Sequence, residues 1–107
     1  MTKADLSNAV TMLSALAQET RLELFRLLVK QGPEGMNAGS IAERLGVPRS
    51  TLSYHLTELE QSHLIQSEKH ARQIIYSANF ERLEGFLSFL VEDCCQGSGD
   101  KCFKLSL

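Results

Sequence analysis

The 107-residue chain has no tryptophan, two prolines and three cysteines. No apolar run approaches the ~20 residues that a membrane-spanning helix needs, and the first residues lack the apolar stretch of a secretory signal. We therefore expect a cytoplasmic protein without membrane contact, in which three cysteines do not form a structural disulfide framework. The balance of 43% hydrophobic and 22% charged residues predicts one globular domain with its own core.

The sequence also lacks the positive net charge that is usual for nucleic-acid binding. Its formal net charge is −2, and the acidic excess lies entirely in residues 73–107. Any affinity for DNA must therefore depend on the positions of individual Lys and Arg side chains, because the net charge does not supply it. The chain has no nucleophile–base constellation, no glycine-rich phosphate loop and no dinucleotide motif, so we do not expect an enzyme.

Hydrophobic periodicity predicts two long helices in the first third of the chain. Apolar residues recur at steps of three and four between Leu6 and Ala17, which indicates an amphipathic helix. Six of the eight residues from Leu22 to Val29 are apolar, which predicts a second helix buried nearly all round. The segment 32–35, Gly-Pro-Glu-Gly, predicts the turn that ends it.

Two shorter helices joined by residues 46–48, Gly-Val-Pro, give a helix-turn-helix pattern. Asn37 is expected to cap the first, and Pro48 suits the first turn of the second. An inward stripe of Leu52, Leu56 and Leu59 leaves a small, polar outer face on the second helix. Such a face can enter the DNA major groove closely, and a residue near the helix N-terminus can reach base edges.

Two short strands, at 64–67 and 73–77, are predicted to form a hairpin after this pair of helices. The charged hairpin, with its link at 68–72, would lie along the DNA backbone or the minor groove, where Lys69 and Arg72 could pair with phosphates. His63, which precedes the first strand, is expected at positive φ, a conformation that histidine tolerates.

A last helix is expected to begin near Asn79. Its apolar face is wider than one partner helix requires, so we expect it to pair with a second copy of the chain beside the first helix. The expected contact residues are Leu6, Val10, Leu13, Leu83, Leu87 and Leu90.

The sequence resembles the ArsR/SmtB family of winged-helix metal-sensing repressors over residues 6–95. The resemblance lies in 16–22 (LAQETRL), 39–47 (GSIAERLGV), 48–56 (PRSTLSYHL) and the Ile75-Tyr76 pair. It implies a mostly helical α+β fold, a winged helix-turn-helix with a two-stranded wing and dimerisation helices at both ends. It further implies a homodimer, a palindromic double-stranded DNA operator and repression that a ligand relieves. By position, the DNA-contacting residues would be Arg49, Ser50, Thr51, Ser53, Tyr54 and His55.

Two departures from the family direct attention to the end of the chain. Many arsenic-sensing members carry a Cys-x-Cys pair near the start of the recognition helix, and zinc-type members carry Asp and His ligands on the last helix. Neither set is present here. The cysteines are Cys94, Cys95 and Cys102, at the end of a predicted domain of residues 1–96 and in a predicted flexible tail of residues 97–107.

This cysteine cluster is the only soft-ligand site in the sequence. Thiolates bind soft ions strongly, and trivalent arsenic or antimony takes three of them in a pyramid. Glycines at 97 and 99 let the chain fold back so that Cys102 joins Cys94 and Cys95. The sequence therefore predicts a repressor that leaves DNA on binding trivalent arsenic, antimony or a methylated trivalent arsenical.

Several alternatives remain open at this stage. A Cys95–Cys102 disulfide is feasible and would make the protein a redox-sensing repressor. Zinc or cadmium would need a fourth ligand, and none stands at a recognised spacing. The chain could also be a dimeric redox or metal-buffering protein that does not bind DNA, or the thiols could be incidental.

Overall fold

The computed structural model describes residues 3–92 and confirms the expected winged helix-turn-helix. Over this range no helix is both long and apolar enough to cross a bilayer. The elements in chain order are α1 (Lys3–Leu16), α2 (Glu19–Gln31), β1 (Met36–Asn37), α3 (Ala38–Leu45), α4 (Arg49–Gln61), β2 (Ile65–His70), β3 (Gln73–Ala78) and α5 (Phe80–Leu90).

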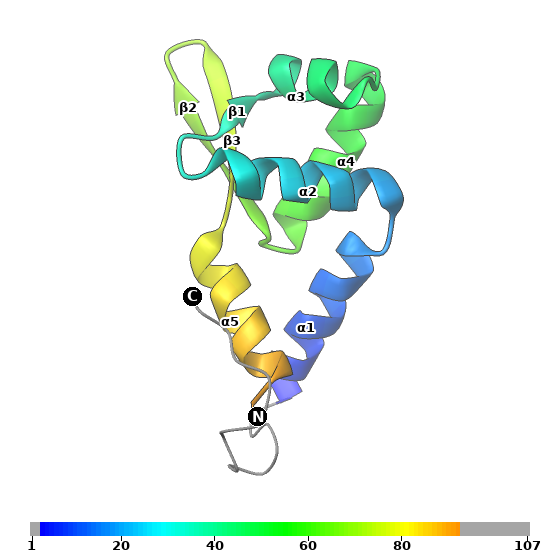
Figure 1. Ribbon diagram of the computed structural model, residues 1–107, viewed down its shortest axis with the longest axis vertical. Helices are drawn as coiled ribbons and strands as arrows, with labels where there is room; N and C mark the ends of the chain where they lie inside the picture. The colour runs from blue at the N-terminus through cyan, green and yellow to red at the C-terminus, as the bar shows by residue number, and fades with distance from the viewer. Residues whose placement is uncertain (1–2, 93–107) are drawn as a thin grey trace.

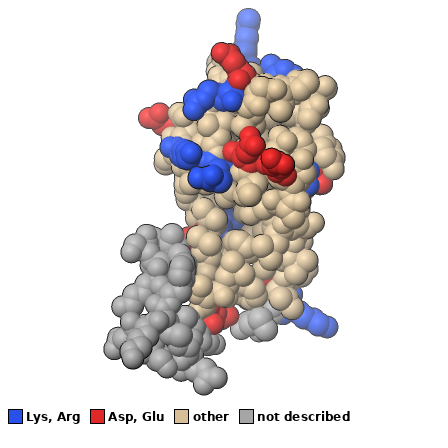
Figure 2. Space-filling view, turned by 45° about the vertical axis from the view of Figure 1, so that its right-hand side comes forward, with Lys and Arg blue, Asp and Glu red and all other residues tan. Residues whose placement is uncertain are grey.

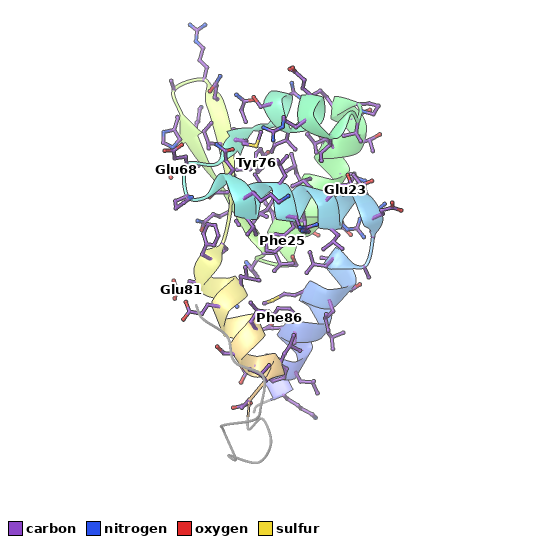
Figure 3. The ribbon with its side chains drawn as sticks, viewed as in Figure 1. Glu23, Phe25, Glu68, Tyr76, Glu81 and Phe86 are labelled. Carbon is purple, nitrogen blue, oxygen red and sulfur yellow. The ribbon has the colours of Figure 1, made fainter. Side chains whose placement is uncertain are left out.

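The helix α2 lies across the middle of the molecule and divides it into two ends (Figure 1). At one end lie α3, the first part of α4 and the β2–β3 hairpin. At the other end α1 and α5 descend from this layer and converge, so that segments far apart in the sequence lie side by side. Phe86 on α5 points towards α1 across the gap between these helices (Figure 3).

The core forms where α2, α3, α4 and the start of the hairpin meet. Its fully buried side chains are Leu24, Leu28, Ile41, Leu52, Leu59 and Leu64. The prediction that α2 is buried nearly all round is wrong, because Leu22 is 45% exposed. The buried residues of α2 are Leu24, Phe25 and Leu28, which share one face, and the opposite face meets solvent.

Side-chain caps define where three of the helices begin. The Asn37 side-chain oxygen accepts from the Ser40 amide at 2.8 Å, and the Asn79 oxygen accepts from the Arg82 amide at 3.1 Å. Both satisfy amides that have no partner within the helix, and both caps confirm the sequence prediction. A third cap was not predicted: Gln18 accepts from the Arg21 amide at 2.8 Å and begins α2.

The three strands form an antiparallel sheet in the order β1-β3-β2. The hairpin is longer than predicted, with register running from Ile65 opposite Ala78 to His70 opposite Gln73. Most of the charged link is therefore strand, and the turn is confined to residues 71–72 because Ala71 adopts φ 57°. The sequence did not predict β1, whose two residues pair with β3.

The end of α4 turns sharply into the hairpin. His63 lies at φ 66°, which confirms the expected positive φ. The Leu64 amide then donates to the Leu59 carbonyl at 3.2 Å, and the Ser62 hydroxyl donates to the same carbonyl at 2.8 Å. This turn fixes the direction in which the hairpin leaves α4.

Candidate nucleic-acid interface

A tight three-residue turn joins α3 to α4. Gly46 ends α3 in the left-handed conformation at φ 67°, and its amide donates to the Ala42 carbonyl. The Val47 amide donates to that carbonyl as well, at 3.1 Å. Pro48 precedes α4 as its N-cap residue, in extended conformation and without a side-chain hydrogen bond, so it lies just before the first turn in which it was predicted. The amides of the first turn of α4 thus face outward at the positive end of the helix dipole, where an anion is favoured.

The fourth helix separates cleanly into an apolar and a polar face. Leu52, Leu56 and Leu59 are at most 3% exposed and pack into the core. The opposite face carries the exposed residues Arg49, Ser50, Thr51, Ser53, Tyr54 and Thr57. Five of these were predicted to contact DNA, and the structure brings them together on one surface.

The Arg49 guanidinium lies beside Gly39 at the start of α3. A side-chain carbon at Gly39 would lie 3.6 Å from the Arg49 Nη1 atom. The guanidinium of the first residue of α4 therefore lies beside the first turn of α3.

His55 does not belong to this surface, contrary to the sequence prediction. Its side chain is 6% exposed, and its Nδ1 atom lies 3.3 Å from the Arg21 Nη1 atom. A guanidinium only donates hydrogen bonds, so Nδ1 is the unprotonated acceptor. Burial, and then the charge of Arg21, lower the pKa of His55 from its usual range, while Glu58 raises it in part.

The lowered pKa makes His55 a source of acid sensitivity. Above the unfolded-state pKa of about 6.5 both states hold a neutral imidazole. Below it the unfolded chain takes up a proton that the folded chain resists, so the free energy of unfolding falls as pH drops from about 6.5 towards the lowered folded-state pKa.

We expect His55→Gln to flatten this pH dependence between pH 7.5 and 5.5. Urea unfolding followed by far-ultraviolet circular dichroism measures it, because the protein has no tryptophan. Arg26→Gln, which places a glutamine at an exposed position of α2 and leaves all three histidines unchanged, is the control and should keep the wild-type slope. A wild-type slope in His55→Gln would show that His55 does not resist protonation.

The β2–β3 hairpin carries exposed charges of both signs. Lys69 lies in β2 and Arg72 in the turn, both exposed as predicted. The His70 Nε2 atom lies 3.7 Å from a Glu68 carboxylate oxygen, an ion pair only when the imidazole is protonated. On the face drawn in Figure 2, cations and anions are interspersed over the upper part, and the lower part, which includes α1, carries few charges.

The base of the hairpin is fastened to α4. The Ser67 hydroxyl donates to a Glu60 carboxylate oxygen at 2.9 Å. Burial and then the Glu60 charge raise the pKa of Tyr76 on β3, and Arg49 partly offsets them. Tyr76 thus keeps its proton near neutral pH, and the Ser67–Glu60 hydrogen bond joins β2 to α4.

The residues predicted to form a dimer contact differ in exposure. Leu6, Val10 and Leu13 share one face of α1 and are 47%, 57% and 48% exposed. On α5, Leu90 is 52% exposed, whereas Leu83 and Leu87 are half-buried and pack against the core of the same chain.

The predicted metalloid ligands Cys94, Cys95 and Cys102 lie outside the described residues. Within residues 3–92, no group of three His, Cys, Asp or Glu side chains is placed to share a metal ion.

Comparison with known proteins agrees with this architecture. A family model described as a helix-turn-helix domain matches residues 16–68. The arsenical resistance operon repressor of Bacillus subtilis (strain 168) is 36% identical over 92 residues, which cover 82% of this chain and 84% of the relative.

Two solved structures are similar as well. An ArsR-like transcriptional regulator from Rhodococcus sp. RHA1 matches with a TM-score of 0.75 at 30% identity, over 85% of this chain and 83% of that chain. A homodimeric winged helix-turn-helix DNA-binding domain from Mycobacterium bovis matches with a TM-score of 0.68 over 94% and 95%, at a 22% identity that shows the fold alone. The chain belongs to the ArsR-like family of winged-helix transcriptional regulators, which bind DNA and are not enzymes.

Proposed function

We propose that the protein is a homodimeric repressor whose α4 and hairpin bind a palindromic operator, and that trivalent arsenic or antimony releases it from DNA. The observation that carries DNA recognition is the polar face of α4, where five exposed side chains surround an uncapped helix N-terminus. Small side chains there allow close approach to base edges, and Arg49 can reach a guanine. Lys69 and Arg72 on the hairpin would bind backbone phosphates beside it.

The exposed apolar stripe on α1 supports a dimer. Leu6, Val10 and Leu13 recur at spacings of four and three. The exposed Leu90 is the last residue of α5, a helix that converges with α1 (Figure 1). Covering these side chains with a second copy would bury apolar surface that is now in water. The Mycobacterium bovis domain that shares this fold is itself described as homodimeric.

The inducer is proposed from the cysteines and from one relative. The Bacillus subtilis relative is named an arsenical resistance operon repressor, and Cys94, Cys95 and Cys102 are the three thiols of this chain. Arsenite, As(OH)3, would form three As–S bonds with the three cysteines, and each thiol proton would leave with one hydroxyl, so that three water molecules are released. Antimonite would react in the same way, and a singly methylated trivalent arsenical would bind two sulfurs, because carbon holds its third position.

Release of fluorescently labelled DNA tests this proposal. The DNA is the region upstream of the protein's own gene, and anisotropy is recorded under reducing conditions while arsenite is added. We expect binding at low salt, where phosphate contacts are strongest, and release by arsenite. Absence of binding at low salt would contradict the repressor. Release by peroxide but not by arsenite would assign the cysteines to redox sensing.

Single cysteine variants separate the roles of the three thiols. Cys102→Ser should lose most of the response to arsenite and keep the response to the methylated arsenical, because two thiolates remain. Cys94→Ser and Cys95→Ser should weaken both responses if the adjacent pair is the essential one, because each variant then breaks the pair that both inducers use. All three variants should bind DNA as the wild type does without inducer, which is the internal control. A normal arsenite response in Cys102→Ser would rule out the three-thiolate site.

A further inference from the structure

One side chain of α2 joins the end of α1 to the exposed face of α4. The Arg21 Nε atom donates to the Ala15 carbonyl at 2.6 Å. That carbonyl belongs to the last turn of α1, whose carbonyls have no amide partner within the helix. The last turn of α1 contains no basic residue of its own, so Arg21 supplies the cation that stabilises this helix end.

The other side of the same guanidinium contacts α4. Its Nη1 atom lies 3.3 Å from His55 Nδ1. Its central carbon lies 5.8 Å from the centre of the Tyr54 ring, within the range of a cation–π interaction. The Tyr54 and His55 rings are 5.4 Å apart. Tyr54 is 58% exposed, so this contact orients a side chain that belongs to the polar face of α4.

We propose that Arg21 is a positioning residue for DNA recognition, which fixes Tyr54 and the polar face of α4 relative to α1. The inference rests on the proposed function, since α1 carries the proposed dimer contact and α4 the proposed DNA contact. In a dimer, the angle between α1 and α4 sets where each α4 meets its half of a palindromic site. The planar fork of arginine can serve both helices at once, which the single ammonium of lysine cannot.

Replacing Arg21 by glutamine tests the proposal on DNA. We expect operator affinity to fall at least about tenfold, while the slope of log K against log salt concentration stays at the wild-type value. Arg26→Gln is the matched control, because it removes an exposed cation from the same helix; it should change the affinity little. A slope reduced by about 0.9 would mean that Arg21 contacts a phosphate directly and would overturn the positioning role.

Nuclear magnetic resonance of the protein without DNA gives an independent measurement. Loss of the Arg21 charge should raise the pKa of His55, because that charge contributes to lowering it. The Tyr54 ring protons should shift as the guanidinium leaves the ring, and neither change should occur in Arg26→Gln. An unchanged His55 pKa together with unchanged Tyr54 resonances would overturn the proposal.

The two proposals fail in different ways. If the wild type does not bind the operator at low salt, the proposed function fails. If the wild type binds and Arg21→Gln binds equally well, only the role of Arg21 fails. Should Arg21→Gln not fold, Arg21→Lys provides the DNA measurement, because it keeps the charge and loses the planar fork. We expect Arg21→Lys to bind the operator more weakly than the wild type and Arg26→Gln, and more strongly than a protein without α4 contacts. Wild-type affinity in Arg21→Lys would overturn the proposal.

Discussion

The double variant Arg49→Ala/Ser53→Ala is expected to bind operator DNA about 30-fold to 10⁴-fold more weakly than the wild type. Arg49 is the first residue of α4, and Ser53 lies one turn further along the same exposed face. Each lost base contact costs about 1–3 kcal/mol, and the two contacts are close to additive where they reach different bases. Fluorescence anisotropy with specific and scrambled DNA measures both affinity and specificity.

A matched double variant controls for the loss of an arginine and a serine as such. Arg26→Ala/Ser88→Ala removes the same two side chains from exposed positions of α2 and α5 and should bind the operator normally. Both double variants should keep arsenite binding, because neither replaces a cysteine. Wild-type affinity and specificity in Arg49→Ala/Ser53→Ala would mean that another surface reads the DNA.

Replacing Gly35 by alanine is expected to lower the free energy of unfolding by about 3 kcal/mol or more, a large part of the ~5–15 kcal/mol available to a small domain. Gly35 adopts φ 70°, and a side-chain carbon there would overlap the Tyr76 carbonyl oxygen and lie 2.8 Å from the Ile75 Cγ2 atom. Both partners belong to β3, which is held between two other strands. The sheet must therefore shift to admit a single methyl group.

Gly46→Ala separates the backbone cost from the steric cost. Gly46 has nearly the same φ, 67°, but a side-chain carbon there would meet open space. Its replacement should cost only the left-handed conformation, about 1–2 kcal/mol. Denaturant unfolding of the three proteins gives both values. Equal losses of unfolding free energy in the two variants would show that β3 accommodates the methyl group at Gly35 without a steric cost.

Most of the fold could be predicted because it depends on local signals. Helix positions follow from apolar periodicity, and the caps at Asn37 and Asn79 follow from side chains that act within three residues. The strand β1 could not be predicted, since two residues show no periodicity and pair only through contact with β3. The exposure of Leu22 likewise depends on which elements cover α2, and no neighbouring residue reveals that.

The residues of the candidate site could likewise be predicted where the signal is local and were missed where it is not. The polar face of α4 could be predicted because it is the side of the helix opposite the stripe of Leu52, Leu56 and Leu59. His55 was misplaced although it stands three residues after Leu52 and four before Leu59, a spacing that assigns it to the inward side. Arg21 was missed because its partner His55 is 34 residues away, and no local pattern indicates a contact at that separation.

The thin packing of α5 has a consequence for cooperativity. Among the eleven residues of this helix, Phe86 is the one that is buried, whereas α2 buries three. In a free monomer the amide protons of α5 should therefore exchange with solvent much faster than those of α2. Dimer formation would cover both terminal helices and slow this exchange, so the apparent melting temperature should rise with protein concentration. Dimer formation and the folding of this end of the molecule would then be one coupled equilibrium, which depends on the concentration of the protein.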